Sequence, residues 1–441
     1  MKNDIISYIV RFLIGGNATD DICAQVGYTA DPDGYARYKV VIVPSAFFRE
    51  DVYGQPCSLP SLPLNEIEGV PLLYGMPKVD RKGDTLVVYA DIIAGAFFLI
   101  TRYEEMVRCG VRDMHGRFPG RESLPCRAGF IDRPVVDEYG RLLRQWLRRA
   151  GTDVPEPERK IKKVYLTHDI DVPLYCRTLQ SFLGRVARGG DIFRLLGYYC
   201  GPLEKDPNFT YPFMIKEGNA LREAVGDGKC GIICFFKPGG KHKYDKPHYK
   251  INSGEIKKIL RLLSDNRIAI GLHAGYESGL HPERIAVEKQ RLEQTTGEKA
   301  LCNRHHFLAS REPEDMEMLE KQGITDDFTM GYADVAGFRL GTSRPVRWID
   351  PVSKKISKLT LHPLTVMEHT LDNKKYMGLN YEGALEYCLK LIARTEQAGG
   401  EVVLLWHNEA FNAAEPTHYA PWQTRLYKAL LDDLHGRMAI K

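Results

Sequence analysis

The second part of the chain alternates between short apolar segments and amphipathic segments, and this pattern limits the folds open to it. Apolar runs of strand length occupy residues 165–171, 231–236, 268–272, 324–328 and 401–406. The segments between them carry apolar residues at helical spacing, for example Ile256, Ile259, Leu260 and Leu263. Strands that alternate with helices indicate parallel strands covered by helices. The pattern fits an open sheet and a closed barrel equally well.

Residues 1–150 read as a separate, small α/β domain of unassigned role. Strands are expected at residues 39–43, 71–74 and 85–89. Asp91 is placed to cap a helix that runs to about residue 105, and a second helix is expected after Pro134. Residues 151–158 contain two prolines and three acidic residues without periodicity. We therefore predict a linker at 151–160 and a second domain at 161–441.

A polar cluster follows the first of these helices. It consists of Arg102, Glu104, Glu105, Asp113, His115 and Arg117. We interpret it as an ion-pair network with the second domain rather than as a second active site.

Composition and charge give no indication of a nucleic-acid or membrane partner. The formal net charge is only +4 and the charged residues are interspersed, so nothing requires nucleic acid or an anionic membrane. No apolar run is long enough to span a bilayer. The ten cysteines contain no Cys-x-x-Cys pair, and residues 1–16 fit a short helix without a signal-cleavage site. We expect a cytoplasmic protein with no nucleic-acid partner, and the sequence indicates no particular protein partner.

Titratable residues follow the apolar strands of the second part. They are Asp169 and Asp171, His273, Arg304 and His306, Asp326 and Asp327, and His407. Parallel strands present their carboxyl ends on one face, so these side chains are expected to converge. Carboxylates with imidazoles form a ligand set for zinc or a similar divalent ion.

The order and spacing of these residues resemble the NodB-homology polysaccharide deacetylases, which include carbohydrate esterase family four. Thr167-His168-Asp169-Ile170-Asp171 matches the Asp-x-Asp form of the family's opening motif, and Gly271-Leu272-His273 matches its first metal histidine. Arg304-His305-His306-Phe307 stands where the family has Arg-x-Pro-Tyr, and Leu405-Trp406-His407 matches Leu-x-His. Residues 102–105, 337–343 and 406–408 are more specifically similar to deacetylase-like proteins of Bacteroidetes, which carry an α/β N-terminal domain.

The resemblance implies a distorted (β/α) barrel of about seven parallel strands after the N-terminal domain. It also implies roles for single residues. Asp169 is the general base, Arg304 orients that base, and His407 is the general acid. Asp171 and His273 hold a divalent metal ion, with zinc expected.

The chain departs from the family at the second metal histidine, where it has Glu277. We expect His306 to replace that ligand, because it lies two residues from Arg304 at the end of a neighbouring strand. Glu277 itself and His281 are the other candidates for the metal or the cleft.

The implied activity is removal of an N-acetyl or N-formyl group from an amino sugar of a glycan or glycan precursor. The residues expected to line the substrate cleft are Tyr276, Asp327, Phe338, Arg339 and Trp406, although each also fits a role in packing. One alternative is a metal-free glycan-binding or scaffold protein on a degenerate barrel. Another is a metal-dependent hydrolase of a different C–N bond, such as that of a cyclic amide.

Overall fold

The largest element of the protein is a nine-stranded, curled sheet that lies in the second part of the chain. The computed structural model describes residues 3–16 and 18–439. The strand order is β12-β13-β11-β10-β9-β8-β7-β15-β14. The bounds are β7 Lys163–Ile170, β8 Cys230–Phe236, β9 Ala269–Ala274, β10 Cys302–His305, β11 Asp326–Asp327, β12 Val346–Asp350, β13 Lys355–Leu361, β14 Val366–Met367 and β15 Glu401–Leu405.

This sheet differs from the expected barrel of about seven parallel strands. Its edge strands β12 and β14 do not pair with each other, so the sheet is open within the described residues. All neighbouring strands are parallel except β12 and β13, which form an antiparallel hairpin. The residues of β13 alternate between partly exposed and buried near its end, which is typical of an antiparallel strand with one face toward solvent. Such a strand lacks the apolar run from which β8, β9 and β15 were predicted.

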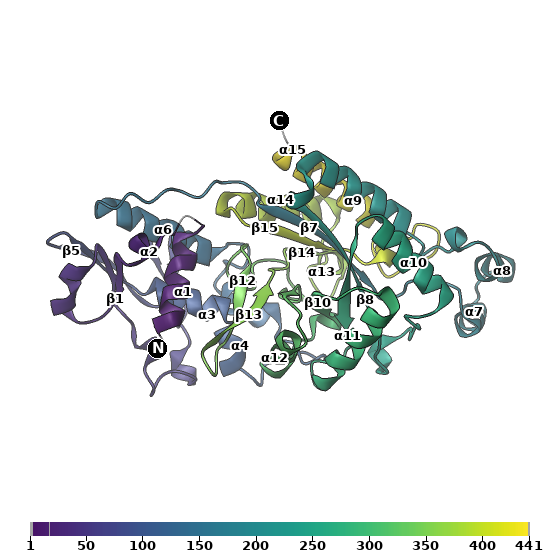
Figure 1. Ribbon diagram of the computed structural model, residues 1–441, viewed down its shortest axis with the longest axis horizontal. Helices are drawn as coiled ribbons and strands as arrows, with labels where there is room; N and C mark the ends of the chain where they lie inside the picture. The colour runs from purple at the N-terminus through teal and green to yellow at the C-terminus, as the bar shows by residue number, and fades with distance from the viewer. Residues whose placement is uncertain (1–2, 17, 440–441) are drawn as a thin grey trace.

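Helices cover the outside of the nine-stranded sheet (Figure 1). Their bounds are α9 Tyr211–Val225, α10 Gly254–Asp265, α11 Glu283–Thr296, α12 Glu314–Lys321, α14 Tyr381–Ala398 and α15 Gln423–Met438. The short helix α13, Glu368–Asp372, follows β14 and packs at the edge of the sheet. The start of α10 is fixed by Ser253, whose side chain accepts a hydrogen bond from Ile256 N. Its expected apolar face is buried, including Ile256 and Leu260. Gly399 ends α14 in the left-handed conformation at φ 66°, which glycine adopts without strain.

A smaller four-stranded sheet lies in the N-terminal part, with the order β1-β2-β6-β5. Its strands are β1 Val26–Tyr28, β2 Val40–Ile42, β5 Gly75–Lys82 and β6 Thr85–Ala90, and a separate hairpin joins β3 Asn65–Ile67 to β4 Val70–Leu72. Three longer helices pack together here, α1 Asn3–Ile14, α3 Ile92–Ile100 and α6 Val135–Arg149; the shorter ones are α2 Asp20–Cys23, α4 Tyr103–Val107 and α5 Leu124–Arg127. Residues 1 and 2, which belong to the stretch expected to form the first helix, lie outside the described part.

Asp91 caps α3 as predicted, since its side chain accepts a hydrogen bond from Ala94 N at 3.0 Å. The helix does not continue to residue 105, however. Arg102 has φ 53° and ψ 38°, a left-handed conformation that interrupts the helix before α4. The interruption directs the Arg102 side chain toward the second part of the chain, where its guanidinium pairs with Glu312.

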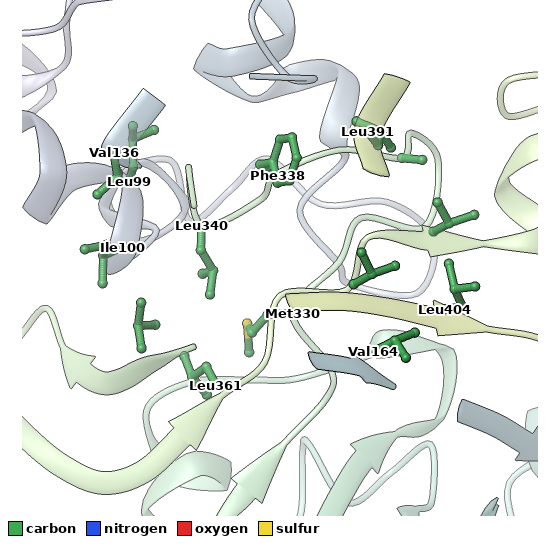
Figure 2. Packing of buried hydrophobic residues seen from close by; sticks show 14 of the residues in the cluster. Leu99, Ile100, Val136, Val164, Met330, Phe338, Leu340, Leu361, Leu391 and Leu404 are labelled. Atoms are coloured by element: carbon green, nitrogen blue, oxygen red, sulfur yellow. The ribbon is translucent and has the colours of Figure 1, made fainter. Parts of the chain in front are cut away.

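One hydrophobic cluster joins the two sheets. Figure 2 shows Leu99 and Val136 of the N-terminal helices near Leu340, while Phe338 and Met330 continue the packing toward the large sheet. The loop after β11 therefore fills the space between the two parts of the chain. Because this cluster contains residues from both sides of 151–160, the division into 1–150, 151–160 and 161–441 stays a prediction.

Ion pairs reinforce the junction between the two parts, as expected for the polar cluster. Arg339 pairs with Glu105 at 2.7 Å, and both side chains are largely buried. Arg344 pairs with Asp137 at 2.6 Å, and Arg117 donates a hydrogen bond to the carbonyl of Phe307 at 2.9 Å. Among the described residues, no helix combines the length and the apolar character needed to cross a membrane.

Candidate active site

The carboxyl ends of β7, β9, β10 and β15 bring the expected metal-binding and catalytic residues together. These strands lie near one another in the sheet and run parallel, so their ends share one edge. Asp171 follows β7, His273 lies near the end of β9, and His306 follows β10. One ligand atom from each of these three residues lies within 4.8 Å of the others. The three residues expected to hold a metal therefore form one group.

Both histidines of this group are oriented through their second ring nitrogen. His273 Nδ1 lies 2.8 Å from the carbonyl oxygen of Arg304, which requires Nδ1 to carry the proton and leaves a lone pair on Nε2. His306 Nδ1 lies 2.8 Å from Asp245 Oδ1, and its Nε2 lies 3.2 Å from Asp171 Oδ2. Carboxylate and carbonyl partners of this kind orient histidine ligands in metal sites.

The buried polar atoms of the group fit a cation. His273 Nε2 and Asp171 Oδ1 lie 3.4 Å apart, and neither forms a hydrogen bond with any described residue. The Lys237 ammonium lies 3.3 Å from Asp171 Oδ1, whereas the buried lone pair of His273 Nε2 has no donor near it in the described part of the chain and would be satisfied by a bound cation. Imidazole nitrogen with carboxylate oxygen is a donor set that zinc accepts.

The other two metal candidates lie elsewhere. After β9 the chain makes a turn in which His281 N donates to the carbonyl of Glu277 at 2.8 Å. The Glu277 carboxylate pairs with Arg284 at 2.7 Å, and the His281 side chain is 53% exposed beside Glu283. The turn carries both side chains away from Asp171. His306 is therefore the third member of the group, and Glu277 and His281 are not.

Asp169 is held as a carboxylate by a buried arginine. Arg304 Nη1 lies 2.9 Å from Asp169 Oδ1, and Arg304 Nε donates to the carbonyl of Phe328 at 3.0 Å. Burial by itself would raise the pKa of Asp169, but the charges of Arg304 and His273 outweigh it and hold that pKa below its usual range. Asp169 is consequently ionised at neutral pH and can accept a proton.

His407 is held as an imidazolium by a glutamate of α13. His407 Nδ1 lies 2.6 Å from Glu368 Oε1, and the other ring nitrogen lies 3.7 Å from Asp171 Oδ2. Burial alone would lower the pKa of His407, but Glu368 outweighs it and raises the pKa to about 10. A protonated histidine therefore stands beside an ionised aspartate at the same strand edge.

Three further residues at the site were not identified from the sequence. Lys237, directly after β8, is 2% exposed, and its ammonium lies 3.3 Å from Asp171 Oδ1. Lys237 also ends an apolar strand, so the rule that selected His273 and His407 could have found it. Asp245 ends the short 3₁₀ helix Lys243–Asp245 and Glu368 begins α13, and no local pattern distinguishes either residue.

The surrounding charges and burial shift the pKa values of Asp171 and Glu409 in opposite directions. Burial would raise the pKa of Asp171, but His306 and Lys237 outweigh it and hold the pKa well below its usual range. Glu409 follows β15 by a few residues, and burial together with the charge of Asp171 raises its pKa to about 7. Glu409 is thus a much weaker acid than Asp171, the carboxylate of the candidate metal group.

Of the five residues expected to line the cleft, Tyr276 lies near the candidate metal ligands. Tyr276 stacks on His242 with a centroid distance of 4.6 Å, and its ring also contacts Phe307, the neighbour of His306. This aromatic group, with His115 and Tyr244, forms a wall beside the candidate metal ligands.

The other four residues have structural roles. Phe338 lies in the core (Figure 2), and Trp406 is fully buried against Tyr427, on the side opposite to His407 because side chains alternate along a strand. Arg339 is occupied by Glu105, and Asp327 accepts hydrogen bonds from Asn303 and Thr329 beneath the sheet edge. These four residues therefore do not line a cleft beside the candidate metal ligands.

A family model described as a family of unknown function (DUF7033) matches residues 8–152. No curated protein matches the chain. A candidate polysaccharide deacetylase from Mycobacterium smegmatis is 14% identical, with 64% of this chain and 86% of that chain covered and a TM-score of 0.41. A GH57 branching enzyme from Thermococcus kodakaraensis is 13% identical, with 63% and 69% covered and a TM-score of 0.38.

Proposed function

We propose that this protein is a metal-dependent hydrolase that removes an N-acetyl or N-formyl group from an amino sugar of a glycan or glycan precursor. The observation that supports the proposal is the arrangement of three kinds of group at one sheet edge. A ligand triad (Asp171, His273 and His306) lies beside an ionised carboxylate, Asp169, and a protonated imidazole, His407. Metal-dependent amide hydrolysis uses all three kinds, as Lewis acid, general base and general acid.

The triad would hold a divalent ion, with zinc the first ion to test. Such an ion supplies a Lewis acid that polarises a carbonyl oxygen and lowers the pKa of water. Asp245 and the carbonyl of Arg304 keep the two histidine rings in place for this role.

Asp169 serves as the general base in this proposal. It accepts a proton from the water that adds to the acyl carbon, and Arg304 keeps the carboxylate ionised and correctly placed. The lowered pKa of Asp169 ensures that the base is available at neutral pH.

His407 serves as the general acid. It donates its Nε2 proton to the sugar nitrogen as the C–N bond breaks, which converts a poor leaving group into a free amine. The products are the amino sugar and acetate or formate. Glu368 restores the charge of the imidazole by favouring its protonation from solvent. The aromatic wall around Tyr276 supplies a ring face against which a sugar could stack.

The test is an assay of acyl release by the purified protein with added zinc. The panel consists of N-acetyl and N-formyl amino sugars together with cyclic amides, and acetate, formate and free amine are measured separately. Asp169→Asn and His407→Gln should each reduce kcat at least about 100-fold. His281→Gln serves as the control, because that histidine lies outside the site. Turnover of cyclic amides alone would favour the alternative function, a metal-dependent hydrolase of a different C–N bond. The absence of turnover of any substrate would reject the proposal.

A second candidate, a metal-free glycan-binding protein, is favoured by one specific observation. The Lys237 ammonium already places a positive charge 3.3 Å from Asp171, where a metal would also bind. Metal analysis of the purified protein separates the two candidates. Stoichiometric zinc that is lost in Asp171→Ala supports the hydrolase, whereas glycan binding without metal and unchanged in that variant supports the binding protein.

A further inference from the structure

The α7–α8 hairpin lies close in sequence to the candidate site. Helix α7 spans Leu179–Val186 and α8 spans Ile192–Cys200, and both follow strand β7 and Asp171. In Figure 1 the hairpin lies at the right-hand end of the molecule, outside the helices that surround the large sheet. The two helices pack on each other through a small cluster of their own, formed by Cys176, Phe182 and Leu195.

The outer face of this hairpin is also apolar. Leu179 and Leu183, four residues apart on α7, are 60% and 54% exposed. On α8, Ile192, Phe193 and Leu196 are 47%, 82% and 40% exposed. These five are the only exposed large hydrophobic side chains of residues 179–196, and the remaining described residues contribute just seven more. A helix that is apolar on its inner and outer sides requires a second apolar surface to cover it.

The hairpin is also strongly basic. Residues 177–200 contain four arginines and one aspartate, a formal charge of +3. Arg188 is exposed and has no ion-pair partner among the residues that the structure describes. Arg177 pairs with Asp206 at 3.7 Å and Arg194 with Glu415 at 2.9 Å, whereas Arg185 lies over the ring of Tyr175. Arg185 and Arg188 are therefore the arginines of the hairpin without an acidic partner among the described residues. The local charge thus differs from that of the whole chain, in which acidic and basic residues nearly balance.

Apolar side chains surrounded by arginines fit one kind of surface in particular. Helices that lie in a membrane interface insert leucine and phenylalanine among the acyl chains and direct arginine toward acidic headgroups. A second copy of the chain fits less well, because a symmetric contact would bring two patches of net positive charge together.

We propose that the α7–α8 hairpin docks the protein onto the surface of a membrane that contains anionic phospholipid. Leu183 and Phe193 enter the interface, and Arg188 contacts the headgroups. The proposal is independent of the proposed function, because it concerns a surface outside the site. It would bring the strand edge that carries Asp171 close to molecules anchored in the lipid.

Co-sedimentation of the full chain with vesicles tests this proposal. Vesicles of phosphatidylglycerol with phosphatidylcholine should bind the protein at least about tenfold more tightly than vesicles of phosphatidylcholine alone. Phe193→Asp and Leu183→Asp should each weaken that binding at least about tenfold. Arg188→Glu should weaken it as well and reduce its dependence on salt. Met114→Asp is the matched control, since Met114 is 80% exposed outside the hairpin.

Three outcomes would overturn the proposal. They are equal binding to both kinds of vesicle, binding that is unchanged in Phe193→Asp, and an equal loss in Met114→Asp. Light scattering tests whether a second copy of the chain covers the surface instead. If the wild type is a dimer that does not bind vesicles, and Phe193→Asp converts it to a monomer, the surface belongs to a dimer interface. Circular dichroism and the thermal midpoint verify that each variant is folded.

Discussion

His407 Nδ1 lies 2.6 Å from Glu368 Oε1, and the backbone N–H of His407 donates to the same oxygen at 2.7 Å. One carboxylate therefore fixes the ring of His407 and its charge together. The ring is protonated at neutral pH, because the pKa of His407 is raised to about 10. A protonated imidazole next to an ionised carboxylate, Asp169, suits the roles of general acid and general base that we propose for these two residues.

Replacing Glu368 by glutamine should lower the alkaline limit of activity. Without the carboxylate, the pKa of His407 should fall from about 10 toward about 6.5, its ordinary value. The acid acts only when protonated, so activity is kept below this pKa and lost above it. At pH 8.5 the variant should lose roughly 100-fold in kcat/KM, as measured in a pH profile. Glu277→Gln, which removes a carboxylate paired with Arg284, should leave the profile unchanged. An unshifted profile in Glu368→Gln would argue against His407 as the acid.

Lys237→Met should strengthen metal binding. The Lys237 ammonium and a divalent ion compete for the Asp171 carboxylate, so removal of the ammonium favours the ion. We expect zinc affinity to rise at least about tenfold in competition with a chelating dye, which corresponds to about 1.4 kcal/mol. Lys289→Met, a largely buried lysine paired with Glu293, is the control. Weaker zinc binding in Lys237→Met would instead indicate that the Lys237 amine is itself a ligand.

Asp245→Asn should weaken metal binding although Asp245 is outside the triad. Its carboxylate orients His306 through Nδ1 at 2.8 Å, and partners of this kind contribute about 10-fold to 100-fold to metal affinity. The same chelator competition measures the change. Asp227→Asn, which alters an exposed ion pair with Arg267, should have no effect on affinity. Equal affinities for wild type and Asp245→Asn would remove His306 from the ligand set.

His362→Gln should reduce stability in acidic and neutral solution but less so in alkaline solution. His362 is buried and pairs with Asp326 of β11 and Glu401 of β15, which are not neighbours in the sheet, at 2.9 Å each. Burial alone would lower the pKa of His362, but the two carboxylates outweigh it and raise that pKa from 6.5 to about 8. The charged pairs therefore stabilise the folded state below about pH 6.5 and lose this effect as the pH rises through about 8.

The size of this effect follows from the pKa. A rise from 6.5 to about 8 corresponds to about 2 kcal/mol in the free energy of unfolding. Urea denaturation at pH 6 and pH 9 measures the difference between wild type and variant. His281→Gln, an exposed histidine, should change neither value. A deficit in His362→Gln that is the same at both pH values would mean that packing, not charge, is responsible.

Several parts of the fold were predictable because buried parallel strands and covering helices have distinct local patterns. The runs at β7, β8, β9 and β15 are continuous and apolar, and α10 and α14 repeat apolar residues at helical spacing. The β12–β13 hairpin and the interruption at Arg102 were not predicted, since neither leaves a strong local pattern. The α7–α8 hairpin was not predicted either, although its apolar residues recur every four positions.

The candidate site was also predictable only in part. The sequence by itself determined the residues at the strand ends, because parallel strands deliver the side chains that follow them to one edge, as with Asp171, His273 and His306. Only the tertiary structure decided which groups surround them. Glu368 reaches His407 from a helix 39 residues earlier, and Asp245 reaches His306 from a 3₁₀ helix 61 residues earlier. The direction of Trp406 and Phe338 into the core also depends on packing against distant segments, which no local pattern encodes.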